Sequence, residues 1–141
     1  DGDPAVRAKV TELLGQVGDT ASESLLLTML ADRDRWIRAA AAFSLGRIGS
    51  DRAVDAVAKY TKRAKLEADN LIAAINGLGR GRSPRAADAL GRIALDVNHD
   101  RRVRRYAVLA LAGLANRAGQ DTLKKLTAFG TPQYMQLALR H

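Results

Sequence analysis

The sequence predicts an all-α solenoid, and three observations lead to this prediction. A Leu-Gly pair, replaced by Leu-Ala in its last copy, recurs at spacings of 31, 33 and 33 residues, at Leu14, Leu45, Leu78 and Leu111. Residues that favour helix starts recur in register with this landmark. Each proline stands where a helix is expected to begin, and no stretch shows the alternating β-branched pattern of a strand. A fixed period of this length is typical of stacked helix pairs.

Each period is interpreted as two helices. In the second copy, Ile37, Ala41, Leu45 and Ile48 fall on one face of a helix that Asp34 is suited to cap. A second helix is expected to follow in each copy, because residues of capping type occupy one shared register position: Asp19, Ser50, Ser83 and Asn116. The pattern therefore predicts hydrophobic columns inside the stack, formed by Val6-Ile37-Val103 and by Leu14-Leu45-Leu78-Leu111.

The predicted units cover residues 3–31, 34–64, 67–97 and 100–129 of a single repeat domain spanning 1–141. The third unit is unusual, because its first helix contains Gly77 and Gly79, and glycine in a helix costs about 1 kcal/mol relative to alanine. We interpret it as a thin helix that neighbours approach closely or as a helix that ends early, in preference to a functional bend. Thr131-Pro132 repeats an earlier start signal. A partial fifth unit, one final helix over 131–141, is therefore expected, and with it a longer parent solenoid.

The composition argues against most reaction centres. The 141 residues contain no cysteine, so thiolate metal sites and cysteine nucleophiles are excluded. Of the two histidines, His99 lies in a polar turn and neither has a second ligand at helical metal spacing. We therefore predict no catalytic residue, cofactor or metal, and a small-molecule ligand is not expected. No membrane span is expected either. The absence of cysteine and of a visible signal peptide favours a cytoplasmic location.

The expected second helices carry a regular pattern of charge. Acid precedes base by four residues in each, which predicts ion pairs within Asp55-Lys59, Asp88-Arg92 and Asp121-Lys125. The repeat stacks these residues into an acidic and a basic column. Two interpretations stay open: a solvated face that stabilises its own helices, which the pattern favours, or a ligand groove striped with charge.

Cations also gather at the expected turns between units. The formal net charge is +8, which favours acidic partners. Because turns between units share one edge of a solenoid, we expect a basic ridge formed by Arg33, Arg35, Lys62, Arg63, Lys65, Arg101 and Arg102. Such a ridge would contact phosphates, acidic lipids or an acidic protein segment. Aromatic residues are only 4% of the chain, and Trp36, near a helix start, is predicted to pack rather than to stack on bases.

The motif D-x-x-V-R, followed by A-x-x-x-LG-x-IG and an A-V-x-x-L-like second helix, resembles short HEAT-like repeats of the phycobilisome-lyase type. The second unit matches almost throughout, with Asp34, Ile37 and Arg38 and then Ala53 and Val54. The third departs at Asn70 and Leu71. The resemblance implies a right-handed superhelix of antiparallel helix pairs whose second helices line the concave side.

The resemblance also implies a binding scaffold as the commonest function. We therefore predict a non-catalytic protein–protein interaction module whose partner is another protein with an acidic segment. One alternative is an enzyme or enzyme subunit on a HEAT-like fold, resembling bilin lyases or acting on DNA bases. A second alternative is a nucleic-acid binder, for which the few aromatic residues predict weak, electrostatic and salt-sensitive binding.

Overall fold

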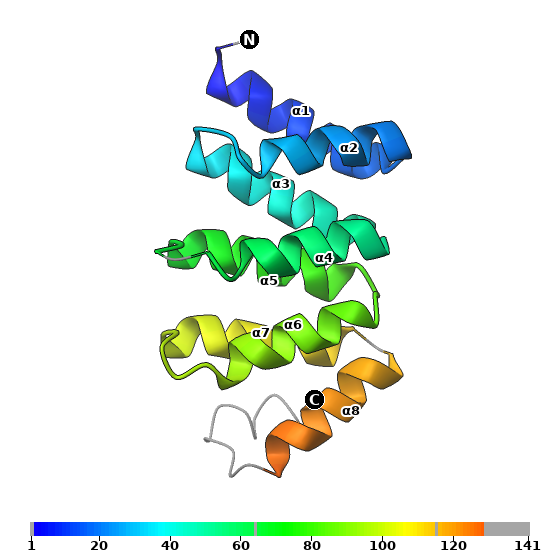
Figure 1. Cartoon of the computed structure of the whole chain (residues 1–141), viewed down its shortest axis with the longest axis vertical. Coiled ribbons are helices and arrows are strands. Elements are labelled where there is room, and N and C mark those ends of the chain that lie inside the picture. Colours follow the sequence, from blue (N-terminus) through cyan, green and yellow to red (C-terminus); the bar gives the residue numbers. More distant parts are fainter. Residues whose placement is uncertain (1, 64, 115, 129–141) are drawn as a thin grey trace.

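The computed structural model describes residues 2–63, 65–114 and 116–128, which form eight α-helices and no strand. The helices stack as four successive pairs along the long axis (Figure 1). This confirms the predicted all-α, solenoid-like fold; the predicted final helix over 131–141 lies outside the described residues. The helices are α1 (Pro4–Val17), α2 (Thr20–Met29), α3 (Arg35–Ile48), α4 (Asp51–Tyr60), α5 (Ala68–Arg80), α6 (Arg85–Leu95), α7 (Arg101–Gly113) and α8 (Arg117–Thr127).

The pairs form two layers. The first helices α1, α3, α5 and α7 pack on one another in one layer, and the second helices α2, α4, α6 and α8 pack in sequence in the other. The turns that follow α2, α4 and α6 lie along one edge of the stack, on the left in Figure 1. The molecule therefore presents a surface of consecutive second helices, called here the second-helix face, beside an edge made of inter-unit turns.

Side-chain caps begin most of the helices, as the sequence predicts. The Asp34 carboxylate accepts the amide of Trp36 at 2.8 Å, and the Asp19 carboxylate accepts that of Ser22 at 2.7 Å. Ser50 and Asn116 cap α4 and α8 in the same way. Each cap satisfies an amide that has no partner within its own helix. The hydrogen bond from Ser22 also lowers the pKa of Asp19.

The predicted cap at Ser83 is wrong. Helix α6 begins only at Arg85, with Pro84 in helical conformation ahead of it and no side-chain cap. The Ser83 carbonyl accepts the amide of Ala86 at 3.1 Å, which closes a tight first turn. The Ser83 hydroxyl is buried without a hydrogen-bond partner. The helix thus starts one residue later than predicted, and the Ser83 hydroxyl caps no amide of α6.

The predicted hydrophobic columns are buried wherever a first helix has neighbours on both sides. Leu45 and Leu78 are 0% exposed, and Leu111, Ile37 and Val103 are each 1% exposed. The prediction is wrong in the first unit, where Val6 is 47% exposed and Leu14 is only half-buried. Helix α1 packs against α2 and α3, and no helix in the described part of the chain covers its opposite side.

Glycine brings α3 and α5 together. A Cβ built on Gly77 would lie 2.7 Å from the Cα of Phe43, and one built on Gly46 would lie 2.6 Å from the backbone carbon of Gly77. The two backbones thus touch at positions where no side chain fits. Helix α5 continues to Arg80, so the interpretation of a thin helix is confirmed and that of an early end is wrong.

Asn70, which departs from the repeat motif, connects three helices. Its side chain is 0% exposed at the start of α5. The Nδ2 amide donates to the Arg35 carbonyl at 3.0 Å and to the Tyr60 hydroxyl at 2.8 Å. A buried amide with two acceptors fixes the neighbours that it bonds. The Asn70 side chain therefore holds the end of α4, where Tyr60 lies, against α3 and α5.

Candidate functional site

The second-helix face carries all six residues of the predicted acid–base pattern. Asp55 and Lys59 lie on α4, Asp88 and Arg92 on α6, and Asp121 and Lys125 on α8. All are exposed except Arg92, which is half-buried. The sequence thus placed them on the expected helices. Their role in binding a partner stays a prediction.

The predicted ion pairs within each helix do not form. Asp55 is held instead by Arg85 of the next unit, whose Nη1 donates to both carboxylate oxygens at 2.9 Å. The Nε of Arg85 lies 3.2 Å from Asp51. The Asp55 hydrogen bond and the charge of Asp51 raise the pKa of Arg85 above its usual value. Stacking brings the first turn of α6 beside α4, where a bridge between units, from one guanidinium nitrogen to both Asp55 oxygens, takes the place of the predicted Asp55-Lys59 pair.

The other two predicted pairs are replaced as well. Arg92 donates to the Thr61 hydroxyl at 3.1 Å and to the Ala58 carbonyl at 3.4 Å, so this cation spans from α6 to the end of α4. Asp121 lies 3.8 Å from Arg117, one turn before it, rather than beside Lys125. Ion pairs this exposed contribute little stability.

In the described part of the chain, the groove between α4 and α6 and the groove between α2 and α4 differ in charge. The first, of about 300 Å³, is called the α4–α6 groove and is lined by Val54, Asp55, Ala58, Lys62, Arg85, Asp88, Ala89 and Arg92. Its two arginines are engaged by groups of the chain itself. This groove therefore contains carboxylates as well as cations, and the Arg85 charge is already matched by Asp55.

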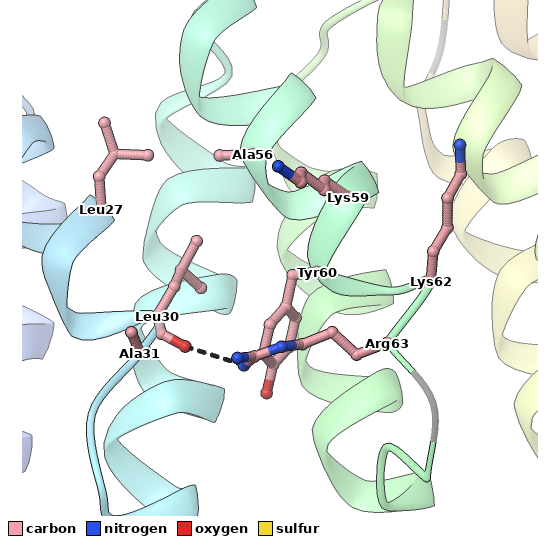
Figure 2. A pocket seen from close by; sticks show the side chains of 8 residues that line it. All are labelled: Leu27, Leu30, Ala31, Ala56, Lys59, Tyr60, Lys62 and Arg63. Atoms are coloured by element: carbon pink, nitrogen blue, oxygen red, sulfur yellow. Dashed lines mark hydrogen bonds between the residues drawn. The ribbon is translucent and has the colours of Figure 1, made fainter.

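The second is called the α2–α4 groove. It has a volume of about 370 Å³ and is lined by Leu27, Leu30, Ala31, Ala56, Lys59, Tyr60, Lys62 and Arg63. Figure 2 shows Leu27 and Leu30 on one wall and Ala56, Lys59 and Tyr60 on the other. The apolar groups form the floor, and three exposed cations stand around them. No carboxylate is among the lining residues.

Contacts of Asn70 and Arg63 fix the position of Tyr60 and the helix ends beside the α2–α4 groove. Tyr60 is 4% exposed, and its hydroxyl accepts the hydrogen bond from Asn70 described above. The Arg63 guanidinium lies over the Tyr60 ring, 5.6 Å from its centroid, and donates to the Leu30 carbonyl at 3.2 Å (Figure 2). Arg63 thus joins the end of α2 to the end of α4 at the edge of the groove.

The residues of the predicted basic ridge lie in different environments, and their role in binding stays a prediction. Lys62 and Arg63 line the α2–α4 groove, whereas Arg63 and Lys65 also line an adjoining pocket of about 330 Å³ that contains two carboxylates. Arg35 stacks on the Trp36 ring at 4.5 Å, and Arg102 pairs with an aspartate at 3.3 Å. All seven members of the ridge are exposed, Arg33 and Arg101 included.

Trp36 and His99 lie close to the starts of α3 and α7. Trp36 was expected to pack, but it is 55% exposed and covered on one ring face by Arg35, so that prediction is wrong. The next residue in α3, Ile37, is the buried one at this position. His99 lies in the turn after α6 with its Nε2 3.5 Å from Asp96, in the polar turn where the sequence placed it.

The repeat pattern did not predict the apolar side chains that line the α2–α4 groove. The stretch LLLTML, which ends at Leu30, contains more apolar residues than one buried helix face requires. Leu26 is 0% exposed in the core, whereas Leu27 and Leu30 remain half-buried on the groove wall. This surplus of leucine is the sequence signal that could have located the groove.

Comparison with known proteins concerns the first half of the chain. A family model described as HEAT repeats matches residues 1–69, which cover the first two units and the start of the third. No curated protein matches the chain. The match and the all-helical stack of pairs support a HEAT-like repeat protein. Repeats of this kind are commonly protein-interaction scaffolds. Separately, none of the described helices is long and apolar enough to cross a membrane.

Proposed function

We propose that this HEAT-like repeat protein is a non-catalytic interaction module that binds a partner protein through its second-helix face. The α2–α4 groove is the observation that carries the proposal. It combines a half-buried apolar floor with an exposed polar rim, which is the composition of a protein-binding hot spot. The repeat subtype, the short phycobilisome-lyase type, is proposed from the sequence motif alone.

The groove arises from the stacking of units, which suits it to binding. Its walls come from α2 of the first unit and α4 of the second, together with the residues that end each helix. Both walls belong to packed helices, so the apolar side chains stand in fixed positions before a partner arrives. A surface that is ordered in advance loses less conformational entropy on binding.

Two other kinds of function remain as alternatives: one acts on or binds nucleic acid, and the other handles bilin. An enzyme acting on DNA bases, or another nucleic-acid binder, would use cations with exposed aromatic rings. Trp36 is 55% exposed beside Arg35 but lies outside the α2–α4 groove, and the Tyr60 ring within the groove is only 4% exposed. A bilin-handling protein would hold a chromophore and would change its absorbance when bilin is added. Neither alternative accounts for an apolar groove between two repeat units as directly as a protein partner does.

The proposal is tested by capture from the source lysate, with and without nuclease. The wild-type chain is compared with Lys59→Glu/Lys62→Glu, which reverses two exposed charges of the groove rim. Arg82→Glu/Arg105→Glu, at exposed positions away from the groove, provides a control of equal charge change. We expect the wild type and the control to retain a protein after nuclease treatment, and the rim variant to lose it. Bound material that disappears with nuclease, or binding that ignores the rim variant, would contradict the proposal.

A further inference from the structure

We infer that the α2–α4 groove binds an acidic protein segment by one apolar anchor side chain, with flanking carboxylates on the rim cations. This inference rests on the proposed function and specifies the chemistry of the partner. Three features of the groove lead to it: the size and nature of its floor, the lack of carboxylates around it, and the position of Arg63.

The floor fits a side chain rather than a large ligand. A volume of about 370 Å³ is near the lower end of pockets that bind small molecules. Leu27 and Leu30 face Ala56 across it, and the small alanine leaves the space between the two helices open (Figure 2). One leucine-sized or aromatic side chain entering this space would lose its contact with water on two sides. Burial of apolar surface would then hold the segment in place.

The rim lacks the negative charge that its neighbour contains. In the α4–α6 groove, Arg85 is matched by Asp51 and Asp55. In the α2–α4 groove, all lining residues are neutral or cationic, and Lys59 and Lys62 form no ion pair within the described structure. Lys62 stands between the two grooves and lines the α4–α6 groove as well. An acidic segment would supply the missing carboxylates, and its charges would also speed the encounter.

The arrangement favours a protein segment over a nucleic acid. Phosphates would be attracted by the cations alone and would gain nothing from the leucines between them. Bases would need a ring on which to stack, and Arg63 already covers the Tyr60 ring. An anchor side chain flanked by carboxylates uses both the floor and the rim, so it is the occupant that matches the whole groove.

The test measures fluorescence anisotropy of short labelled peptides titrated with the whole chain. One peptide has glutamates flanking a single leucine, a second has serine in place of that leucine, and a third has lysines in place of the glutamates. We expect the glutamate–leucine peptide to bind about tenfold more tightly than the serine peptide, in line with the burial of one leucine. The lysine peptide should show no binding.

Groove variants then locate the binding site. Leu27→Ser should weaken the glutamate–leucine peptide about tenfold without affecting the serine peptide. Leu25→Ser, at an exposed leucine of the same helix outside the groove, is the matched control and should bind as the wild type does. Lys59→Glu/Lys62→Glu should weaken both acidic peptides, and because its positions are exposed it stays informative if Leu27→Ser fails to fold.

The inference is overturned if the leucine and serine peptides bind equally, because binding would then be charge attraction alone. It is also overturned if no groove variant changes binding, or if a single-stranded oligonucleotide or an acidic phospholipid vesicle displaces the peptide and binds more tightly. A lysate protein that needs Lys59 and Lys62, together with no peptide preference, would reject this partner chemistry and leave the proposed function standing. If the wild-type chain captures no protein from the lysate but still prefers the glutamate–leucine peptide over the serine peptide, the proposed function is rejected.

Discussion

Gly77→Ala is the sharpest test of how the helix pairs stack. An alanine Cβ at this position would lie 2.7 Å from the Cα of Phe43 and 2.9 Å from its carbonyl carbon, so the neighbour is backbone and cannot rotate away. Alanine is intrinsically favoured over glycine in a helix by about 1 kcal/mol. Overpacking a tight interior costs about 1–3 kcal/mol, and more where backbone must move. Because the neighbour is backbone, the upper part of that range, about 2–3 kcal/mol, applies. Subtracting the helix-propensity gain of about 1 kcal/mol leaves an expected net loss of about 1–2 kcal/mol in the free energy of unfolding.

The assay is urea unfolding followed by circular dichroism, with Gly113→Ala as the matched control. Gly113 also lies in a first helix, but a Cβ there would meet nothing within 4 Å. The control should gain up to about 1 kcal/mol, because only helix propensity changes. With a urea m-value of about 1–3 kcal/mol/M, the midpoints of the two variants should move in opposite directions. Equal or greater stability of Gly77→Ala would refute the close approach of α3 and α5.

Three further outcomes follow from single contacts. Asp34→Ala should lower the free energy of unfolding by about 1 kcal/mol, because it removes a helix cap. Ser83→Ala should leave the free energy of unfolding unchanged or raise it, because the Ser83 hydroxyl is buried without a partner. Urea midpoints of the two variants are compared with that of the wild type. Asn70→Ala should cost about 1–3 kcal/mol and, in a double-mutant cycle with Tyr60→Phe, should show coupling between them. Because the pKa of Asp19 is lowered in the fold, its charged form stabilises the protein above the ordinary carboxyl pKa, and this contribution disappears as pH falls through the lowered value. The difference in urea midpoint between wild type and Asp19→Asn should therefore narrow in acid, and a difference that is constant with pH would contradict the cap's charge dependence.

The sequence by itself determined the number of helix pairs in the described chain and most of their starting points. Caps such as Asp34 and Asn116 act on amides two or three residues away, so their effect is visible in a short window of sequence. The buried leucines Leu45 and Leu78 were equally accessible to prediction, because a helical face follows from the spacing of apolar residues. These features depend on local geometry that the chain carries wherever it is placed.

Only the tertiary structure decided which charges meet and where the surface opens. Asp55 has a suitable partner on its own helix in Lys59, but stacking brings Arg85 of the next unit closer, with two oxygens within reach of one guanidinium. Likewise, the α2–α4 groove is open because the surplus leucines of α2 face the small Ala56 across the space between two units. Both outcomes depend on contacts between residues about one repeat apart, which are fixed by the offset and rotation of packed helices rather than by the sequence of either helix.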